Sequence, residues 1–290
     1  MGVLRRKRRK DQIGPDPDSG LHERLLDSDE SDDYQPKAKR SKVTVLDQAV
    51  KLFTYLVGKV AEYIIPSAFG WFGSSSAKKL SELQSRRLFE LKARVGVKFD
   101  QDSHGKDLEK LWSLAFPDLP FVEGKTKQWQ EMGWQSDHPS SDFRGGGYLA
   151  LECLVYLAER KPLVFQRLCF KTQGKRSDWE YPFGAAGVNL TFMLRKVLDL
   201  VDGAKESPPS TKAGRSFLAL LDIEEERYDT SFEELFCSTF ELLDKIWLED
   251  KADYMQFPSV MKKVEDKVTK IMSKGAPLSS LEQYHEDLLG

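Results

Sequence analysis

Apolar side chains recur along most of this chain with the period of an α-helix. From Lys78 onward they are spaced three or four residues apart, which places them on one face of each segment. The first positions with this pattern are Leu80, Leu83, Leu88, Leu91 and Val95; Leu108, Leu111, Trp112 and Ala115; and Leu151, Leu154, Val155 and Ala158. No alternating run of strand length and no internal repeat is present. The pattern predicts an all-α fold: a single irregular helical domain over residues 78–273, then a C-terminal tail over 274–290.

Two long helices are predicted near the end of this domain. Ser231 and Glu234 have the spacing of a capping box ahead of an apolar stripe, and Ser259 is placed to cap the last helix. The two stripes comprise Phe232, Leu235, Phe236, Thr239, Leu242, Leu243, Ile246 and Trp247, then Val260, Val264, Val268 and Ile271. Both segments are therefore predicted to be amphipathic helices.

Residues 43–65 are apolar enough to suggest a membrane span until their charges are placed on a helix. Four charged residues fall on one arc, and most apolar side chains fall on the opposite one. The four are Asp47, Lys51, Lys59 and Glu62. The segment is predicted to be an amphipathic helix, ended by Pro66 and followed by a linker, so that helix and linker span 43–77. Two interpretations stay open: the apolar stripe packs on the following domain, or residues 37–65 lie on a membrane surface.

Residues 1–42 carry charge in blocks that change sign. A basic block at residues 5–10 gives way to an acidic stretch, and a second basic block follows at 37–42. Such segments bury too little to order themselves, so a disordered tail is predicted. The basic blocks fit a nuclear-import signal, a contact with an anionic membrane, or a solvated tail. The whole chain is nearly balanced, with 44 basic and 46 acidic residues, which argues against nucleic-acid binding.

The sequence lacks the motifs of a self-sufficient enzyme. Cys153, Cys169 and Cys237 lie among apolar neighbours without a C-x-x-C pair, which indicates buried thiols in a reducing compartment. The histidines are isolated, so no metal site is expected, and there is no Walker motif and no G-x-S-x-G elbow. The N-terminus lacks the apolar stretch of a secretory signal. A cytoplasmic protein is predicted, peripheral on a membrane if residues 37–65 contact lipid.

The stretch over residues 129–147 is chemically distinctive. It places Arg144 between an aspartate and three consecutive glycines, directly before an apolar helical segment. Glycine costs roughly 1 kcal/mol per residue against alanine in a helix, which suggests that something must approach the backbone there. Asp142 is a candidate N-cap of the following helix, which would put Arg144 near a helix N-terminus, where phosphates bind. Arg144 either faces a phosphate or pairs with a carboxylate such as Asp142, and both interpretations stay open.

The same stretch resembles the signature of the ELMO domain (engulfment and cell motility) family. The matching positions are Trp129, Gly133, Trp134, Gln135, Pro139, Ser141, Asp142, Phe143, Arg144, Gly145, Gly147, Leu151 and Leu154. The flanks, residues 104–118 and 181–194, are similar to the family as well. The resemblance covers roughly residues 80–250. Because the chain retains Arg144, it resembles the small single-domain members of the family. The large scaffold members lack this arginine pattern.

The resemblance implies an all-helical domain that activates small GTPases of the ADP-ribosylation-factor type. Arg144 would act as an arginine finger in trans, neutralising charge that develops on the γ-phosphate. The chain would then regulate a GTPase without being a free-standing enzyme. It would need no cofactor of its own, because GTP and Mg²⁺ belong to the partner. The alternative is a non-catalytic adaptor that binds a small GTPase or its exchange factor.

The resemblance also assigns supporting residues around the arginine. Asp142, Gly145 and Gly147 would shape its loop, Gln135 would orient a backbone group or a water molecule, and Trp129 is expected to pack. Three positions depart from the family's usual Phe, Gly and Thr, namely Trp134, Ser136 and Ser141. The first and third keep an aromatic ring and a hydroxyl. The serine at 136 removes backbone freedom and is expected to affect how closely a partner docks.

Overall fold

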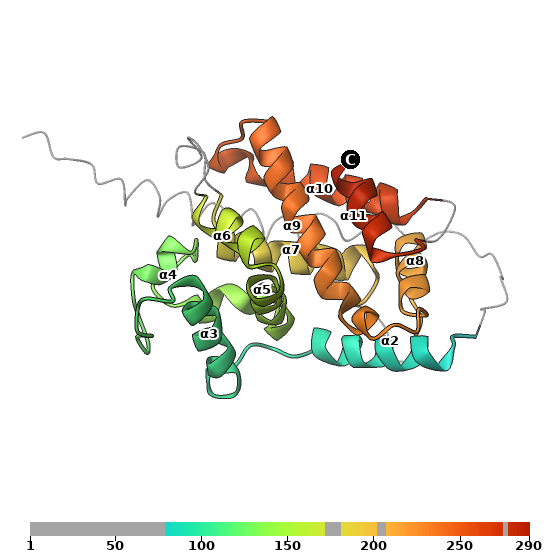
Figure 1. Ribbon diagram of the computed structural model, residues 1–290, viewed down its shortest axis with the longest axis horizontal. Helices are drawn as coiled ribbons and strands as arrows, with labels where there is room; N and C mark the ends of the chain where they lie inside the picture. The colour runs from blue at the N-terminus through green and yellow to red at the C-terminus, as the bar shows by residue number, and fades with distance from the viewer. Residues whose placement is uncertain (1–78, 172–180, 202–206, 275–277) are drawn as a thin grey trace, which may run out of the picture. The chain divides into compact units, whose positions relative to one another are not determined.

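The structure, a computed structural model, describes residues 79–171, 181–201, 207–274 and 278–290 of the chain. The predicted tail, amphipathic helix and linker, residues 1–77, lie outside the described residues. Within the described ranges every regular element is a helix and none is a strand, so the predicted all-α fold class is confirmed (Figure 1).

Ten α-helices and three short 3-10 segments follow one another along the described residues. The α-helices are α2 (Glu82–Val95), α3 (Gln101–Ala115), α4 (Gln128–Glu131), α5 (Tyr148–Arg160), α6 (Pro162–Phe170), α7 (Phe183–Val197), α8 (Lys212–Leu220), α9 (Ser231–Glu249), α10 (Phe257–Met272) and α11 (Leu281–Leu289). Short 3-10 segments are η1 (Pro139–Arg144), η3 (Glu226–Thr230) and η4 (Tyr254–Gln256). Side-chain caps explain some of the starts: Ser81 and Gln84 form a capping box at α2, and Asp100 caps α3.

α9 and α5 form the centre of the described core. α9 lies against α5, α7, α10 and α11, while α5 also lies against α3 and α6 (Figure 1). Phe240 of α9 stacks on Phe183 of α7 with ring centroids 5.0 Å apart, and both rings are fully buried. Burying one such side chain contributes about 2–3 kcal/mol. This buried stack therefore fixes the start of α7 against α9 in the centre of the domain.

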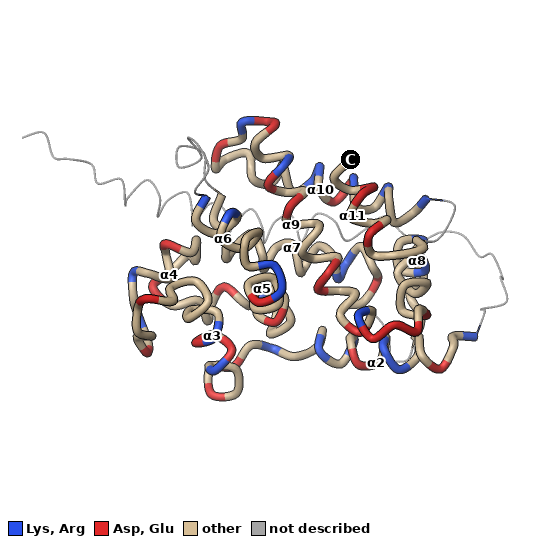
Figure 2. Tube along the Cα trace, viewed as in Figure 1, with Lys and Arg blue, Asp and Glu red and all other residues tan. Residues whose placement is uncertain are grey.

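Charged residues of both signs are interspersed along the described helices (Figure 2), and a few of them are buried. Arg94 of α2 lies 2.5 Å from the carboxylate of Glu233 on α9 and 3.7 Å from that of Glu152 on α5. Glu233 is almost completely buried. Burial, together with the negative charges of Glu233 and Asp107, raises the pKa of Glu152, although Arg94 opposes the shift. Arg94 thus links α2, α5 and α9, because its positive charge compensates the negative charges of Glu152 and Glu233.

Replacing Arg94 with methionine is expected to lower the free energy of unfolding by about 3 kcal/mol, because Glu233 would remain buried without its countercharge. Urea unfolding at neutral pH measures this change. Lys262→Met is the matched control, since Lys262 is exposed and pairs with carboxylates on its own helix. The control should change stability by less than about 0.5 kcal/mol. Equal effects of the two substitutions would contradict a stabilising role for the buried cluster.

Two helix caps expected from the sequence are wrong in detail. Thr230, not Ser231, precedes α9, and the Ser231 hydroxyl donates to the Tyr228 carbonyl, so the predicted capping box is absent there. The Ser259 hydroxyl likewise donates to the carbonyl of Gln256, inside a helix that begins at Phe257. In both cases the side chain bonds backwards to a carbonyl three residues earlier instead of accepting from the first turn.

The C-terminus requires a third correction. The sequence pattern predicts a tail over residues 274–290, but α11 occupies Leu281–Leu289 and packs against α9. Tyr284 and Leu288 are fully buried, and the hydroxyls of Tyr284 and Thr239 lie 2.9 Å apart. The helical domain therefore extends beyond residue 273.

Candidate functional site

The candidate site is the loop that joins η1 to α5. η1 ends at Arg144, three glycines follow, and α5 begins at Tyr148 with Gly147 as its N-cap. Asp142 is therefore not the N-cap of this helix, contrary to the expectation from the sequence, and Arg144 precedes the helix instead of lying in its first turn. The glycines occupy the positions between the 3-10 turn and the helix, so a turn of backbone separates Arg144 from the α5 N-terminus.

Arg144 is exposed on this loop. Its Nε donates to the Ser141 carbonyl at 3.2 Å, a local bond within the same 3-10 turn. Among the residues that the structure describes, no carboxylate lies within ion-pair distance of its guanidinium. The carboxylate-pairing interpretation is therefore not what this structure shows. The exposed guanidinium has further donors that suit a carboxylate or phosphate of another molecule.

Asp142 points to a different partner. Its carboxylate accepts from the backbone N–H of Gln135 at 2.9 Å, which joins η1 to the segment after α4 (Gln128–Glu131). Burial raises the pKa of Asp142 to about 6, although the bond from Gln135 and the charge of Arg144 both favour the ionised form. Asp142 thus links the turn that carries Arg144 to the segment after α4, and Gln135 contributes its backbone N–H to this link.

This raised pKa predicts a pH dependence of stability. Because folding raises the pKa of Asp142, the folded state binds the proton more tightly, and the contribution of this group to stability falls as pH rises from about 4 to about 6. Asp142→Asn keeps an acceptor for the Gln135 N–H but cannot ionise. The stability of the variant relative to the wild type should increase by on the order of 2 kcal/mol between about pH 4 and pH 7. Urea titrations at several pH values test this, and parallel profiles for the two proteins would contradict it.

The three glycines of the loop differ in what they require. Gly147 has φ +66°, and a Cβ there would lie 2.6 Å from the Val97 carbonyl oxygen. A Cβ on Gly146 would lie 2.6 Å from the Cβ of Ala150. At Gly145, by contrast, a Cβ would meet only the Val188 side chain at 3.9 Å, which is ordinary contact. Folding therefore explains Gly146 and Gly147, whereas Gly145 is exposed and free of such a constraint.

Buried aromatic side chains support the turn that carries Arg144. Phe143, directly before Arg144, is fully buried and stacks on Phe99 with centroids 4.7 Å apart. Its ring also contacts Trp134 at 5.0 Å. Trp129 is buried and packs edge-on against Trp112 at 4.8 Å, so its position fits the packing role expected from the sequence. The indoles of the signature thus have a packing role. The turn that carries the exposed Arg144 is held in place by these buried aromatic side chains.

Sequence reasoning does not identify two residues of this site. Gly146 has no assigned role in the signature, although the packing against Ala150 requires it. Arg195 of α7 donates from Nη1 to the carbonyls of Gly145 and Gly146, at 3.3 and 3.1 Å. No local signal identifies Arg195, because about fifty residues separate it from the loop. Only the packing of α7 against η1 brings them together.

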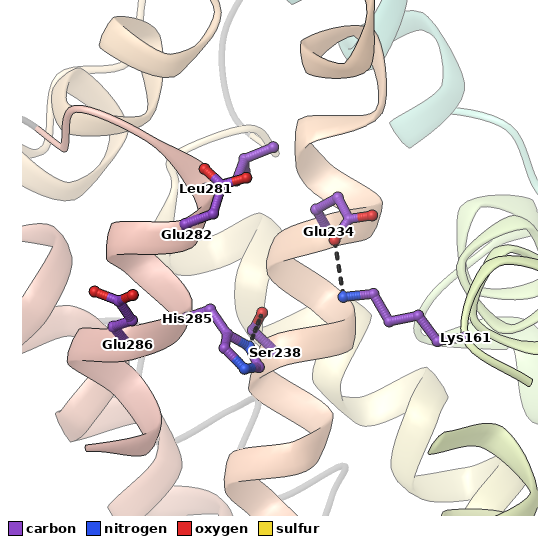
Figure 3. A pocket seen from close by; sticks show the side chains of 7 residues that line it. All are labelled: Lys161, Glu234, Ser238, Leu281, Glu282, His285 and Glu286. Atoms are coloured by element: carbon purple, nitrogen blue, oxygen red, sulfur yellow. Dashed lines mark hydrogen bonds and ion pairs between the residues drawn. The ribbon is translucent and has the colours of Figure 1, made fainter. Parts of the chain in front are cut away.

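A second concave region lies between α9, α11 and the start of α6 (Figure 3). Its volume is about 280 Å³. Lys161 and Glu234 form an ion pair of 3.0 Å on one side, and Ser238 and His285 lie 3.1 Å apart on the other. Four of its polar side chains are thus paired with one another, and it shares no residue with the Arg144 loop. The loop is therefore the stronger candidate for a functional site.

The described residues hold neither a cluster of metal-binding side chains nor a helix that could span a membrane. They contain no group of three or more histidine, cysteine, aspartate or glutamate side chains arranged to bind a metal ion. In the same residues, none of the helices has both the length and the apolar character needed to cross a bilayer.

The fold and the site together define a class of protein: an all-helical domain that presents an exposed arginine on a glycine-rich loop. The profile of the ELMO/CED-12 family matches residues 87–261, which is more than half of the chain. The chain therefore belongs to the ELMO/CED-12 family.

Several relatives carry the same domain. The chain is 32% identical over 199 residues to ELMO domain-containing protein C of Dictyostelium discoideum, a match that covers 67% of this chain and 31% of the relative. It is 28% identical to ELMO domain-containing protein A of the same organism, over 71% of this chain and 22% of the relative. It is 32% identical to mouse ELMO domain-containing protein 1, over 59% of this chain and 54% of the relative. The matches thus span from under a quarter to about half of the length of these relatives.

Proposed function

We propose that this chain is a GTPase-activating protein for small GTPases of the ADP-ribosylation-factor type, and that Arg144 is its arginine finger. The observation that carries the proposal is the exposed guanidinium of Arg144, which lacks a carboxylate partner within the described residues. The turn that carries it is anchored by the buried side chain of Phe143. Family membership supports the proposal, because the signature that surrounds Arg144 is the one that implied this activity. The γ-phosphate of a partner's GTP is an anion of suitable geometry for such a group.

In this mechanism the chain contributes charge and position. Water attacks the γ-phosphorus in the partner's site, the bond to the bridging oxygen breaks, and negative charge develops on the phosphate oxygens. Arg144 would donate hydrogen bonds to those oxygens and stabilise the charge. The neighbouring Gly145 leaves room for close approach of the partner, since it is exposed and carries no side chain. The turn that contains Phe143 would keep the arginine oriented before the partner binds.

A second candidate function is a non-catalytic adaptor for a small GTPase or its exchange factor. In Dictyostelium discoideum ELMO domain-containing protein C, the matched region is 31% of the whole protein. A domain used as one part of a longer chain suits a binding role as well as an activating one. The two candidates differ in whether the chain accelerates hydrolysis after it has bound.

Single-turnover GTP hydrolysis by a panel of purified ADP-ribosylation-factor-type GTPases tests the proposal. Each GTPase is measured alone and with the full chain, and binding is measured in parallel with a non-hydrolysable GTP analogue. Acceleration of at least one GTPase is the expected result. Binding without acceleration would favour the adaptor, and the absence of both would overturn both candidates.

A further inference from the structure

Arg195 reaches the backbone of the Arg144 loop from α7. Its Nη1 donates to two successive carbonyls, those of Gly145 at 3.3 Å and Gly146 at 3.1 Å. It lies in the last turn of α7, half-buried against the loop. One guanidinium thus bonds the backbone of the two residues that directly follow the proposed arginine finger.

The charge of Arg195 is not compensated as that of other partly buried arginines is. Arg94 and Arg167 each pair with a carboxylate on another helix, at 2.5 and 2.7 Å. Within the described part of the chain, Arg195 has no such partner, and its buried Nε makes no hydrogen bond. Burial lowers the pKa of Arg195. A half-buried arginine without a carboxylate partner contributes little to stability. The hydrogen bonds of Arg195 to the two loop carbonyls therefore indicate its role, which is to hold the loop backbone.

The ends of the loop are fixed by other contacts. On one side Phe143 is buried, and its carbonyl accepts from the Gly147 N–H at 2.7 Å. On the other side the Tyr148 N–H donates to the Val97 carbonyl at 3.0 Å. Between these anchors lie Gly145 and Gly146, and glycine gives the backbone wide conformational freedom. The hydrogen bonds from Arg195 restrict the Gly145 and Gly146 carbonyls, which lie between the two anchored ends of the loop.

We infer that Arg195 is a positioning residue for Arg144: by bonding the Gly145 and Gly146 carbonyls, it fixes the direction in which the finger leaves the loop. The inference rests on the proposed function and adds a residue that the sequence signature does not contain. Arg195 itself need not touch the GTPase. Its loss should therefore lower the maximal rate of hydrolysis in the complex while leaving the affinity for the GTPase nearly unchanged.

The kinetic test uses the full chain with Arg195→Met, which keeps an apolar stem of similar length but removes the donors. The maximal single-turnover rate at saturating GTPase activator is expected to fall about ten- to a hundredfold, because a small misplacement of a catalytic group is enough for such a loss. The concentration for half-maximal rate should stay within about twofold. Arg195→Lys, which keeps the charge but not the fork, should recover part of the rate.

The matched control is Arg215→Met on α8. Arg215 also donates to a backbone carbonyl, that of Ser210, but it lies outside the Arg144 loop. Its substitution should leave the maximal rate unchanged. An unchanged rate for Arg195→Met, or an equal loss for both substitutions, would overturn the positioning role.

Hydrogen exchange supplies a readout that needs no GTPase. The amides of Gly147 and Tyr148 are hydrogen-bonded, and a peptide spanning residues 143–149 reports on them. In Arg195→Met this peptide should exchange about tenfold faster, with peptides of α9 unchanged, because only the loop is released. Unchanged exchange would overturn the inference even if the wild type activates a GTPase. If the wild type activates none, the proposed function fails and the catalytic role of Arg195 fails with it, while exchange still decides whether Arg195 restrains the loop.

Discussion

Replacing Arg144 with alanine is expected to slow GTP hydrolysis in the complex by about 10³- to 10⁵-fold, down to the rate of the GTPase alone. The expected loss is large because the guanidinium would stabilise charge that is present only in the transition state. Arg144→Lys should restore little of the rate, since an ammonium group cannot donate two parallel hydrogen bonds to phosphate oxygens. Single-turnover hydrolysis with saturating activator measures both variants.

The same substitution should leave folding and binding nearly intact. Arg144 is exposed, and its one hydrogen bond to the chain is the local bond to the Ser141 carbonyl within the described residues. The free energy of unfolding should therefore change by less than about 0.5 kcal/mol. Arg160→Ala is the control, because Arg160 is an exposed arginine at the end of α5. Full activity of Arg144→Ala would leave Arg144 as a loop residue and favour the adaptor.

The fold class could be predicted because the hydrophobic period reports directly on which face of each helix is buried. Leu88, Leu91 and Val95 are buried in α2, as their spacing indicates. α11 is harder to predict, although Leu281, Tyr284 and Leu288 have the same spacing. A helix of nine residues is marginal in isolation, and α11 is stabilised by packing on α9. That contact joins segments whose pairing cannot be read from the local pattern.

The site was predictable only in part for the same reason. The charge and glycine content around Arg144 marked the loop, and the family signature supplied its proposed role. The N-cap role expected for Asp142 is wrong, because a local capping rule cannot anticipate that its carboxylate accepts from the Gln135 N–H across the turn. The contact between Arg195 and the loop is set by the packing of α7, so no local spacing rule could have identified it. Local chemistry located the arginine, whereas tertiary packing decides how it is presented.

Gly133→Ala is expected to produce the largest loss of stability, about 4 kcal/mol or more. Gly133 has φ +78°, and a Cβ there would lie 2.6 Å from the carbonyl carbon of Pro182 and 2.8 Å from its Cα. These are backbone atoms at the start of α7, which cannot rotate away as a side chain can. Hydrogen bonds from Gly184 to the Met132 carbonyl and from Ala185 to the Gly133 carbonyl join the two segments. Making room for a methyl group would separate them.

Gly124→Ala is the matched control for Gly133→Ala. Gly124 has φ +87°, yet a Cβ there would meet no atom within 4 Å. Its substitution adds the strain of a left-handed residue without the collision, which costs about 1 kcal/mol. Urea unfolding followed by tryptophan fluorescence measures both variants, because Trp134 lies next to Gly133 and is buried. A much larger loss at Gly133 would show that the close approach of the two backbones supports the loop, since Trp134 contacts Phe143 beneath Arg144. Equal losses would mean that the start of α7 moves easily, and that backbone conformation alone explains this glycine.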